Sequence, residues 1–245
     1  MLLTPIMFFG GKGGVGKTTL ATATALRLAQ EGRDVLLVST DPAHNLGHIW
    51  NATLSDVPTT LHPHLAAVEI DPARATEEHL RDVGTQMRRF MPERLHREVD
   101  RHLELARHSP GTHEAAMLER IAELLECRAD YDHIIFDTAP SGHTSRLMAL
   151  PELMAAYTDG LLARREKSDK FGAVVRGMTS AEKSVSASSM DPVDRRNQEI
   201  RSTLLKRRHR FEHLRSALTD SSTTSFFLVL TADRTPVLEL SLIHI

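Results

Sequence analysis

The fold is decided by the stretch Gly11-Lys12-Gly13-Gly14-Val15-Gly16-Lys17-Thr18, which satisfies the phosphate-loop pattern G-x-x-x-x-G-K-[ST]. An apolar run at 6–9 precedes it and a helical pattern at 18–30 follows it, as a strand–loop–helix unit requires. The glycines let backbone N–H groups surround phosphates, and the helix N-terminus adds partial positive charge. A glycine-rich turn without function is the alternative, and the agreement of pattern with context disfavours it.

This loop predicts binding of Mg-ATP. Lys17 can reach the β- and γ-phosphates, and the Thr18 hydroxyl can ligate Mg²⁺. The basic phosphate cradle does not need Lys12, which is either a solvated loop lysine or a second cation for the transferring phosphoryl group. The residues expected to bind the nucleotide are Gly11, Lys12, Gly13, Gly14, Val15, Gly16, Lys17, Thr18 and Thr19.

The rest of the chain predicts an α/β protein with a mainly parallel sheet. Further apolar runs lie at 35–38, 133–136 and 226–230, with a weaker one at 65–70. Two long, mostly helical stretches, roughly 73–128 and 144–220, separate these runs. Pro92 and the turn Ser109-Pro110-Gly111 divide the first stretch into about three helices, and a serine-rich segment at 167–190 is expected to be a loop.

Composition narrows the class of protein. A chain of 245 residues, 41% of them hydrophobic, can form one large domain, and a net charge of −2 argues against a nucleic-acid partner. No apolar run is long enough to span a membrane, and the first residues lack a secretory signal, so we expect a cytoplasmic protein. Cys127 is the single cysteine, which we expect to be a small buried hydrophobic residue, and the fourteen histidines show no metal-ligand spacing.

Two aspartate motifs follow apolar runs. Asp41-Pro42-Ala43-His44-Asn45-Leu46-Gly47 comes after the second run, and Asp137-Thr138-Ala139-Pro140-Ser141-Gly142-His143-Thr144 comes after the run at 133–136. With the phosphate loop, these motifs closely resemble those of the arsenite-pump ATPase and tail-anchored-protein-targeting ATPase family, over about 1–239. Ser109-Pro110-Gly111 with Glu114-Ala115 resembles a segment of the targeting branch. His48 stands where the family often has an aspartate, which we expect to affect switching more than chemistry.

The resemblance implies a role for each matching residue. Asp137 would hold Mg²⁺ together with Thr18, and Asp41 would orient the attacking water. Lys12 would reach across a homodimer to the partner's nucleotide, so the expected catalytic residues are Asp41, Lys12 and Lys17. The stretch 142–144 would form switch II. Taken singly, each aspartate could equally be an ordinary strand-end or helix-capping residue.

The function implied is an Mg-dependent ATP hydrolase, a nucleotide-switched dimer that captures or delivers cargo, as in tail-anchored membrane protein targeting. The alternatives are the catalytic subunit of an arsenite or anion efflux pump, and a nucleotide-binding module without hydrolysis. The cargo would accordingly be a hydrophobic protein segment or a membrane pump subunit, and the protein could be peripheral to the membrane through that partner.

The cysteine content, the motifs and the methionines of the chain bear on which of these functions is favoured. The arsenic site of the pump ATPase and the zinc clasp of eukaryotic targeting relatives both need more thiols than Cys127 supplies. Partitioning ATPases lack the Asp137–Thr144 string, and the nitrogenase iron protein needs two cysteines per subunit. Methionines in the helical stretches suit either a groove for hydrophobic helices or an ordinary helical core; they are Met87, Met91, Met148, Met154, Met178 and Met190.

We predict a single ATPase domain over 1–239. Its core comprises 1–72, 129–147 and 222–239, and its helical subdomain comprises 73–128 and 148–221. The last six residues, 240–245, read Leu-Ser-Leu-Ile-His-Ile, which is also one translation of a transposon adapter used in sequencing libraries. We therefore expect a non-native tail and a truncated fold that lacks the family's adenine-contacting residues.

Overall fold

The structure, a computed structural model, describes residues 3–41, 45–109, 111–138, 159–160 and 192–232. Within these residues six strands form one sheet in the order β3-β4-β2-β5-β1-β6, and every neighbouring pair is parallel except β3 with β4. The predicted α/β class with a mainly parallel sheet is therefore confirmed. The strands are β1 (Ile6–Gly11), β2 (Val35–Ser39), β3 (Thr59–His62), β4 (Leu65–Glu69), β5 (His133–Asp137) and β6 (Thr224–Val229).

The central strands are apolar on both faces because helices cover both sides of the sheet. Alternate residues of β1 show this division: Ile6 and Phe8 join one buried cluster, and Met7 and Phe9 join the other. Phe8 also stacks on Phe136, with ring centroids 4.5 Å apart. Continuous apolar runs in the sequence therefore identified these strands correctly.

Helices α1 (Lys17–Gln30) and α2 (Asn45–Trp50) pack on the face that carries Met7 and Phe9. The packing side of α1 is the predicted one, because Ala21, Ala25, Leu28 and Ala29 are all buried. Gly32 follows this helix with a φ of 81°, in the left-handed region expected after a helix C-terminus.

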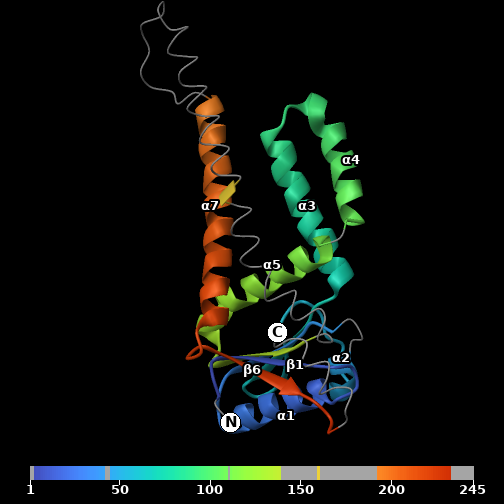
Figure 1. Cartoon of the computed structure of the whole chain (residues 1–245), viewed down its shortest axis with the longest axis vertical. Coiled ribbons are helices and arrows are strands. Elements are labelled where there is room, and N and C mark those ends of the chain that lie inside the picture. The colour runs from blue at the N-terminus through green and yellow to red at the C-terminus, as the bar shows by residue number, and fades with distance from the viewer. Residues whose placement is uncertain (1–2, 42–44, 110, 139–158, 161–191, 233–245) are drawn as a thin grey trace, which may run out of the picture.

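The opposite face supports the longer helices (Figure 1). Helix α5 (Thr112–Glu126) lies along it, and α7 (Pro192–Thr219) reaches it through Phe211 and Leu214. The α7 helix and the pair α3 (Pro72–Phe90) and α4 (His96–Arg107) project away from the sheet on the same side. Short 3₁₀ turns occupy Glu93–Leu95 and Cys127–Asp130.

The predicted division of 73–128 into three helices is confirmed at both breaks. Pro92 follows the end of α3, and Gly111 precedes α5 with a φ of 91°, a left-handed conformation that favours glycine. The Asp71 carboxylate caps the start of α3 by accepting from Ala73 N at 2.8 Å. The assignments made for 144–158, 167–190 and 240–245 lie outside the described residues.

The structure corrects one prediction and adds two elements. Cys127 is exposed rather than buried, because it lies just past the end of α5, in the short 3₁₀ turn that leads to β5. Strand β3 and helix α2 were not anticipated, since each is short; β3 pairs antiparallel with β4 at the end of the sheet. In the described part of the chain, no helix has the length and apolar character needed to cross a membrane, and no group of three or more His, Cys, Asp or Glu residues is arranged so that these residues alone could hold a metal ion.

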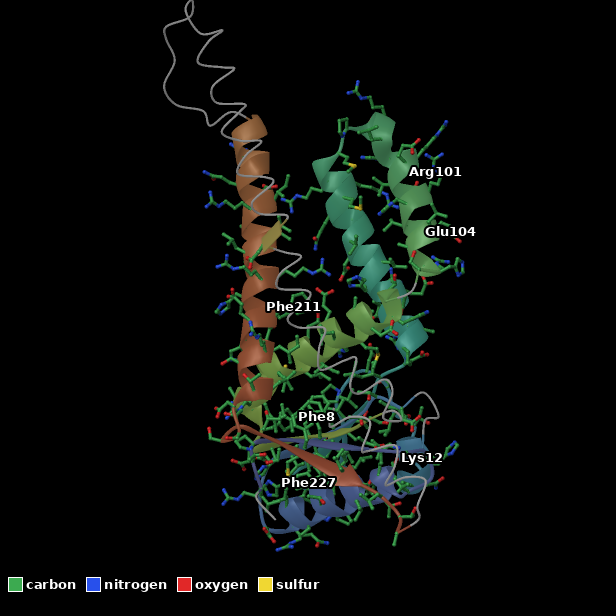
Figure 2. All side chains as sticks on the ribbon, in the orientation of Figure 1. Phe8, Lys12, Arg101, Glu104, Phe211 and Phe227 are labelled. Atoms are coloured by element: carbon green, nitrogen blue, oxygen red, sulfur yellow. The ribbon has the colours of Figure 1, made fainter. Side chains whose placement is uncertain are left out.

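We expect Phe211→Ala to lower the free energy of unfolding by about 3–5 kcal/mol, the range for removing a fully buried aromatic ring. Phe211 is 0% exposed and lies beside α5 (Figure 2), where it joins α7 to the buried cluster that α5 shares with the sheet. Leu205→Ala, on the same helix but 38% exposed, is the control and should cost about 1 kcal/mol or less. Chemical denaturation measures both, and equal losses would show that α7 is not anchored through Phe211.

Candidate nucleotide site

The phosphate loop connects the end of β1 to the start of α1, so it lies at the carboxyl edge of the parallel sheet. Its first glycine is required by the fold itself. A Cβ added to Gly11 would lie 2.1 Å from the carbonyl oxygen of Val229, the last residue of β6. The close approach of β6 therefore fixes glycine at this position, independently of any ligand.

The other glycines of the loop are explained by backbone conformation and open space rather than by close packing. Gly14 and Gly16 have φ values of 79° and 91°, in the left-handed region where side chains are strained. A Cβ on Gly13 would meet no atom within 4 Å, so this stretch of backbone has open space beside it. Such a loop can bring its N–H groups close to a phosphate, as the sequence predicts.

The start of α1 is suited to an anion. Gly16 precedes the helix and provides no side-chain cap, and the first turn contains no acidic residue. Lys17 is 5% exposed, and its ammonium group donates a hydrogen bond of 3.0 Å to the carbonyl of Lys12. Lys17 is thus held within the loop, and Lys12 is half-buried. The two lysines predicted for the site do lie together.

Asp137 is at the end of β5, beside this loop. It pairs in register with Phe9 of β1 and with Ser39 of β2, and its side chain is 0% exposed. Burial raises the pKa of the carboxyl group to about 6; the Thr18 hydroxyl and Lys17 lower it only in part, and the negative charges of Asp41 and Glu69 raise it further. Asp137, the acidic residue that the sequence motif singled out, therefore lies close to Lys17 and Thr18 of the loop.

These residues fit a bound Mg²⁺ ion. Neither carboxylate oxygen of Asp137 accepts a hydrogen bond of normal geometry from the described residues, although both are buried. An unsatisfied buried carboxylate is costly, and a hard cation with oxygen ligands would satisfy it. The Thr18 hydroxyl is close enough to lower the pKa of Asp137, so the two predicted metal ligands lie near each other.

Asp41 follows β2 and is half-buried, with its backbone N–H donating to Ser39 Oγ at 3.3 Å. Its charge acts on Asp137, so it faces the same site. Residues 42–44 and 139–144, which complete the two aspartate motifs, lie outside the described residues. His48 is exposed on α2.

Sequence reasoning missed a third acidic residue of this region. Glu69 ends β4, is 7% exposed, and pairs in register with Ser39 on the side opposite to Asp137. Its charge contributes to the raised pKa of Asp137. The signal was present in the sequence, since a glutamate interrupts the apolar run of β4 on the face that otherwise carries Leu65 and Ala67.

A parallel sheet, a strand–phosphate-loop–helix unit and a buried acidic residue on the adjacent strand together define a P-loop nucleotide-binding protein. Residues 4–243 match the sequence profile of the anion-transporting ATPases, and the chain belongs to that family. The resemblance found in the motifs is thereby confirmed.

Individual relatives carry two kinds of name. An arsenical pump-driving ATPase of Acidiphilium multivorum is 38% identical over 162 residues, which are 64% of this chain and 27% of the relative. A protein of Aquifex aeolicus, provisionally named arsenical pump-driving ATPase 2, is 32% identical over 94% of this chain and 71% of its own length. A Cryptosporidium parvum protein named ATPase ASNA1 homolog is 38% identical over 60% of this chain and 38% of its length. The chain thus spans only about a quarter of the first relative.

We expect Asp137→Asn to stabilise the protein in the absence of Mg²⁺ and nucleotide. The folded-state pKa of about 6 exceeds the ordinary 3.8, so ionised Asp137 destabilises the fold. This cost is absent below pH 4, grows between pH 4 and 6, and reaches about 3 kcal/mol above pH 6.

Denaturation of both proteins at pH 7.5 and pH 4.5 measures this difference. The gain from Asp137→Asn should be larger at pH 7.5. Asp82→Asn, which removes one exposed charge from α3, serves as the control and should show no comparable gain. A gain that is the same at both pH values would contradict the raised pKa.

Proposed function

We propose that the chain is an Mg-dependent ATP hydrolase. The observation that carries this proposal is the meeting of Lys17, Thr18 and the buried, unsatisfied Asp137 at one edge of the sheet. Phosphoryl transfer needs this combination, because the protein acts mainly by positioning and by neutralising charge. The ATPase names of the relatives support adenosine triphosphate as the nucleotide.

Each residue has a separate role in this proposal. The loop N–H groups and Lys17 bind the β- and γ-phosphates. Thr18 and Asp137 would hold Mg²⁺, which would supply positive charge against the phosphates. Asp41 orients the water that attacks the γ-phosphorus atom. Its half-buried place next to Ser39 suits a residue that must meet both water and nucleotide.

We further propose that hydrolysis drives a homodimer that opens and closes around cargo. The helices α3, α4 and α7, which project from the sheet, are the surface available for such a cargo. The catalytic subunit of an arsenite or anion efflux pump is the second candidate, supported by the names of the pump-driving relatives. Trivalent arsenic needs several thiolates, and Cys127 is the single cysteine of these 245 residues, so this part of the protein offers no arsenic site of its own. A hydrophobic protein segment is the cargo we favour.

The first test compares ATP binding and phosphate release in two variants. Lys17→Ala should weaken ATP binding by about 10- to 100-fold, since it removes a charge-assisted contact to the phosphates. Asp41→Asn should bind ATP within about threefold of wild type yet release phosphate about 100-fold more slowly. Lys206→Ala, on α7, is the matched control for loss of a lysine.

Calorimetry and a phosphate-release assay give these values. Normal ATP affinity in Lys17→Ala would contradict the assignment of residues 11–19 as the nucleotide-binding loop. Normal binding with no phosphate release by the wild-type chain would instead favour the nucleotide-binding module without hydrolysis.

The proposed role of Lys12 in the partner's site can be tested by mixing two inactive variants. In a mixed dimer of Lys12→Ala with Asp41→Asn, one of the two sites has its own Asp41 and receives an intact Lys12 from the partner. Co-expression should therefore restore about one quarter of wild-type phosphate release, because about half of the dimers are mixed. If Lys12 acts on its own nucleotide, no mixed site is complete and activity stays at the level of the single variants.

A further inference from the structure

The segment Leu54–Asp56, here named the 54–56 link, joins the nucleotide edge of the sheet to the long helices. It lies in the connection between α2 and β3 and runs alongside the end of β4. The carbonyl of Ser55 accepts a hydrogen bond of 2.8 Å from the backbone N–H of Glu69, and Ser55 Oγ accepts one of 3.2 Å from Val57 N. The link is therefore fixed to β4 at the residue that faces the nucleotide site.

On the nucleotide side, the contact runs through Glu69 and α2. A Cβ placed on Gly47 of α2 would lie 3.4 Å from Glu69 Oε2 and 2.9 Å from the carbonyl oxygen of Ala52. The buried carboxylate thus packs directly against α2, the helix that begins within the Asp41 motif, and its charge also acts on Asp137. A displacement of α2 must be accommodated by Glu69 or by the chain leading to the link.

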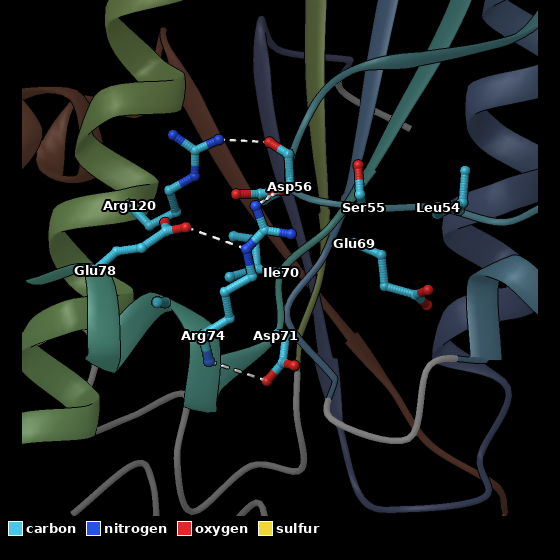
Figure 3. Close-up of a pocket in the computed structure, with 10 residues that line it drawn as sticks. Leu54, Ser55, Asp56, Glu69, Ile70, Asp71, Arg74, Glu78 and Arg120 are labelled. Atoms are coloured by element: carbon cyan, nitrogen blue, oxygen red, sulfur yellow. Dashed lines mark hydrogen bonds and ion pairs between the residues drawn. The ribbon is translucent and has the colours of Figure 1, made fainter.

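On the other side, the link contacts α3 and α5 through Asp56 (Figure 3). The Asp56 side chain, 16% exposed, pairs with Arg74 Nη2 of α3 at 3.3 Å. Its backbone carbonyl accepts a hydrogen bond from Arg120 Nη2 of α5. Arg120 also pairs with Glu123 at 3.0 Å, so a residue of its own helix holds the Arg120 side chain in place.

These contacts are made by long polar side chains around a pocket of about 170 Å³ rather than by close apolar packing. Figure 3 shows Arg74 and Arg120 converging on Asp56 from two helices. Close-packed interiors resist displacement, whereas ion pairs around a pocket can change partner with little steric cost. Arg74 already has a second partner, Glu78, at 3.1 Å. Arg74 can therefore exchange Asp56 for Glu78 without a change in apolar packing.

We propose that the 54–56 link transmits the state of the nucleotide site to α3 and α5, with Asp56 as the positioning residue. A change at the Asp41 motif moves α2, and the link carries this movement past Glu69 to Arg74 and Arg120. The route is separate from the 142–144 stretch expected to be switch II. This inference depends on the proposed ATP binding and names how that site would control the helices.

Amide hydrogen exchange of α3 and α5, with and without Mg-ATPγS, tests the link in the full chain. In the wild type, the nucleotide should change exchange in the first turns of α3 and in the part of α5 around Arg120. Asp56→Asn should bind Mg-ATPγS normally but reduce the nucleotide-dependent change in α3 by about two- to fivefold, the range that one partly exposed ion pair supplies. The change in α5 should persist, because Arg120 contacts the backbone carbonyl of Asp56, which this variant keeps. Arg74→Gln removes the same pair, together with the pair to Glu78, from its exposed partner and should give the same reduction in α3.

Glu78→Gln is the matched control, because it removes the other partner of Arg74 without touching the link. It should keep the full nucleotide-dependent change. Equal effects of Asp56→Asn and Glu78→Gln would overturn the proposal, as would nucleotide binding that leaves exchange in wild-type α3 and α5 unchanged. Failure of the wild type to bind Mg-ATPγS in calorimetry would overturn the proposed function and this inference together, which distinguishes the two cases.

Discussion

The parallel pairing of β1 with β5 and with β6 is the constraint on which the site depends. Parallel strands end at the same edge, so the phosphate loop after β1 and Asp137 of β5 are brought together by the register of Phe9 with Asp137. On the other side, β6 approaches so closely that only glycine fits at position 11. The geometry of the nucleotide site is thus a consequence of backbone pairing, and the ends of distant segments meet without any direct link in sequence.

The cost of this arrangement is concentrated in one carboxylate. The side chain of Asp137 is removed from water by the same layers that make the strands stable, and this burial is the main cause of its raised pKa. A protein that keeps such a group in its core without full compensation is less stable than it could be. The penalty is what gives a cation an energetic advantage at this position, because the ion replaces the hydration that folding removed.

Sequence reasoning was most successful where one strong physical requirement acts on neighbouring residues. The glycines and Lys17 reveal the loop because backbone conformation and phosphate charge demand them, and the apolar runs of β1, β2 and β5 reflect burial on both faces. The β3 strand was missed because four residues with two threonines do not distinguish an edge strand from a turn. Cys127 was misplaced since its burial depends on where α5 ends. Asp56 could not be found at all, because its partners, Arg74 and Arg120, come from helices whose approach only the tertiary structure defines.

Strand β6 lies at the end of the described sheet. The side chains that it exposes on one face are apolar, whereas an ordinary edge strand exposes polar ones. Phe226 and Leu228 are 44% and 49% exposed on one face, and Leu230 continues the apolar row. An edge that offers unpaired backbone groups beside apolar side chains is a template for adding another strand. Among the described residues, the outer edge of β6 is therefore the place where this sheet can take up a further strand.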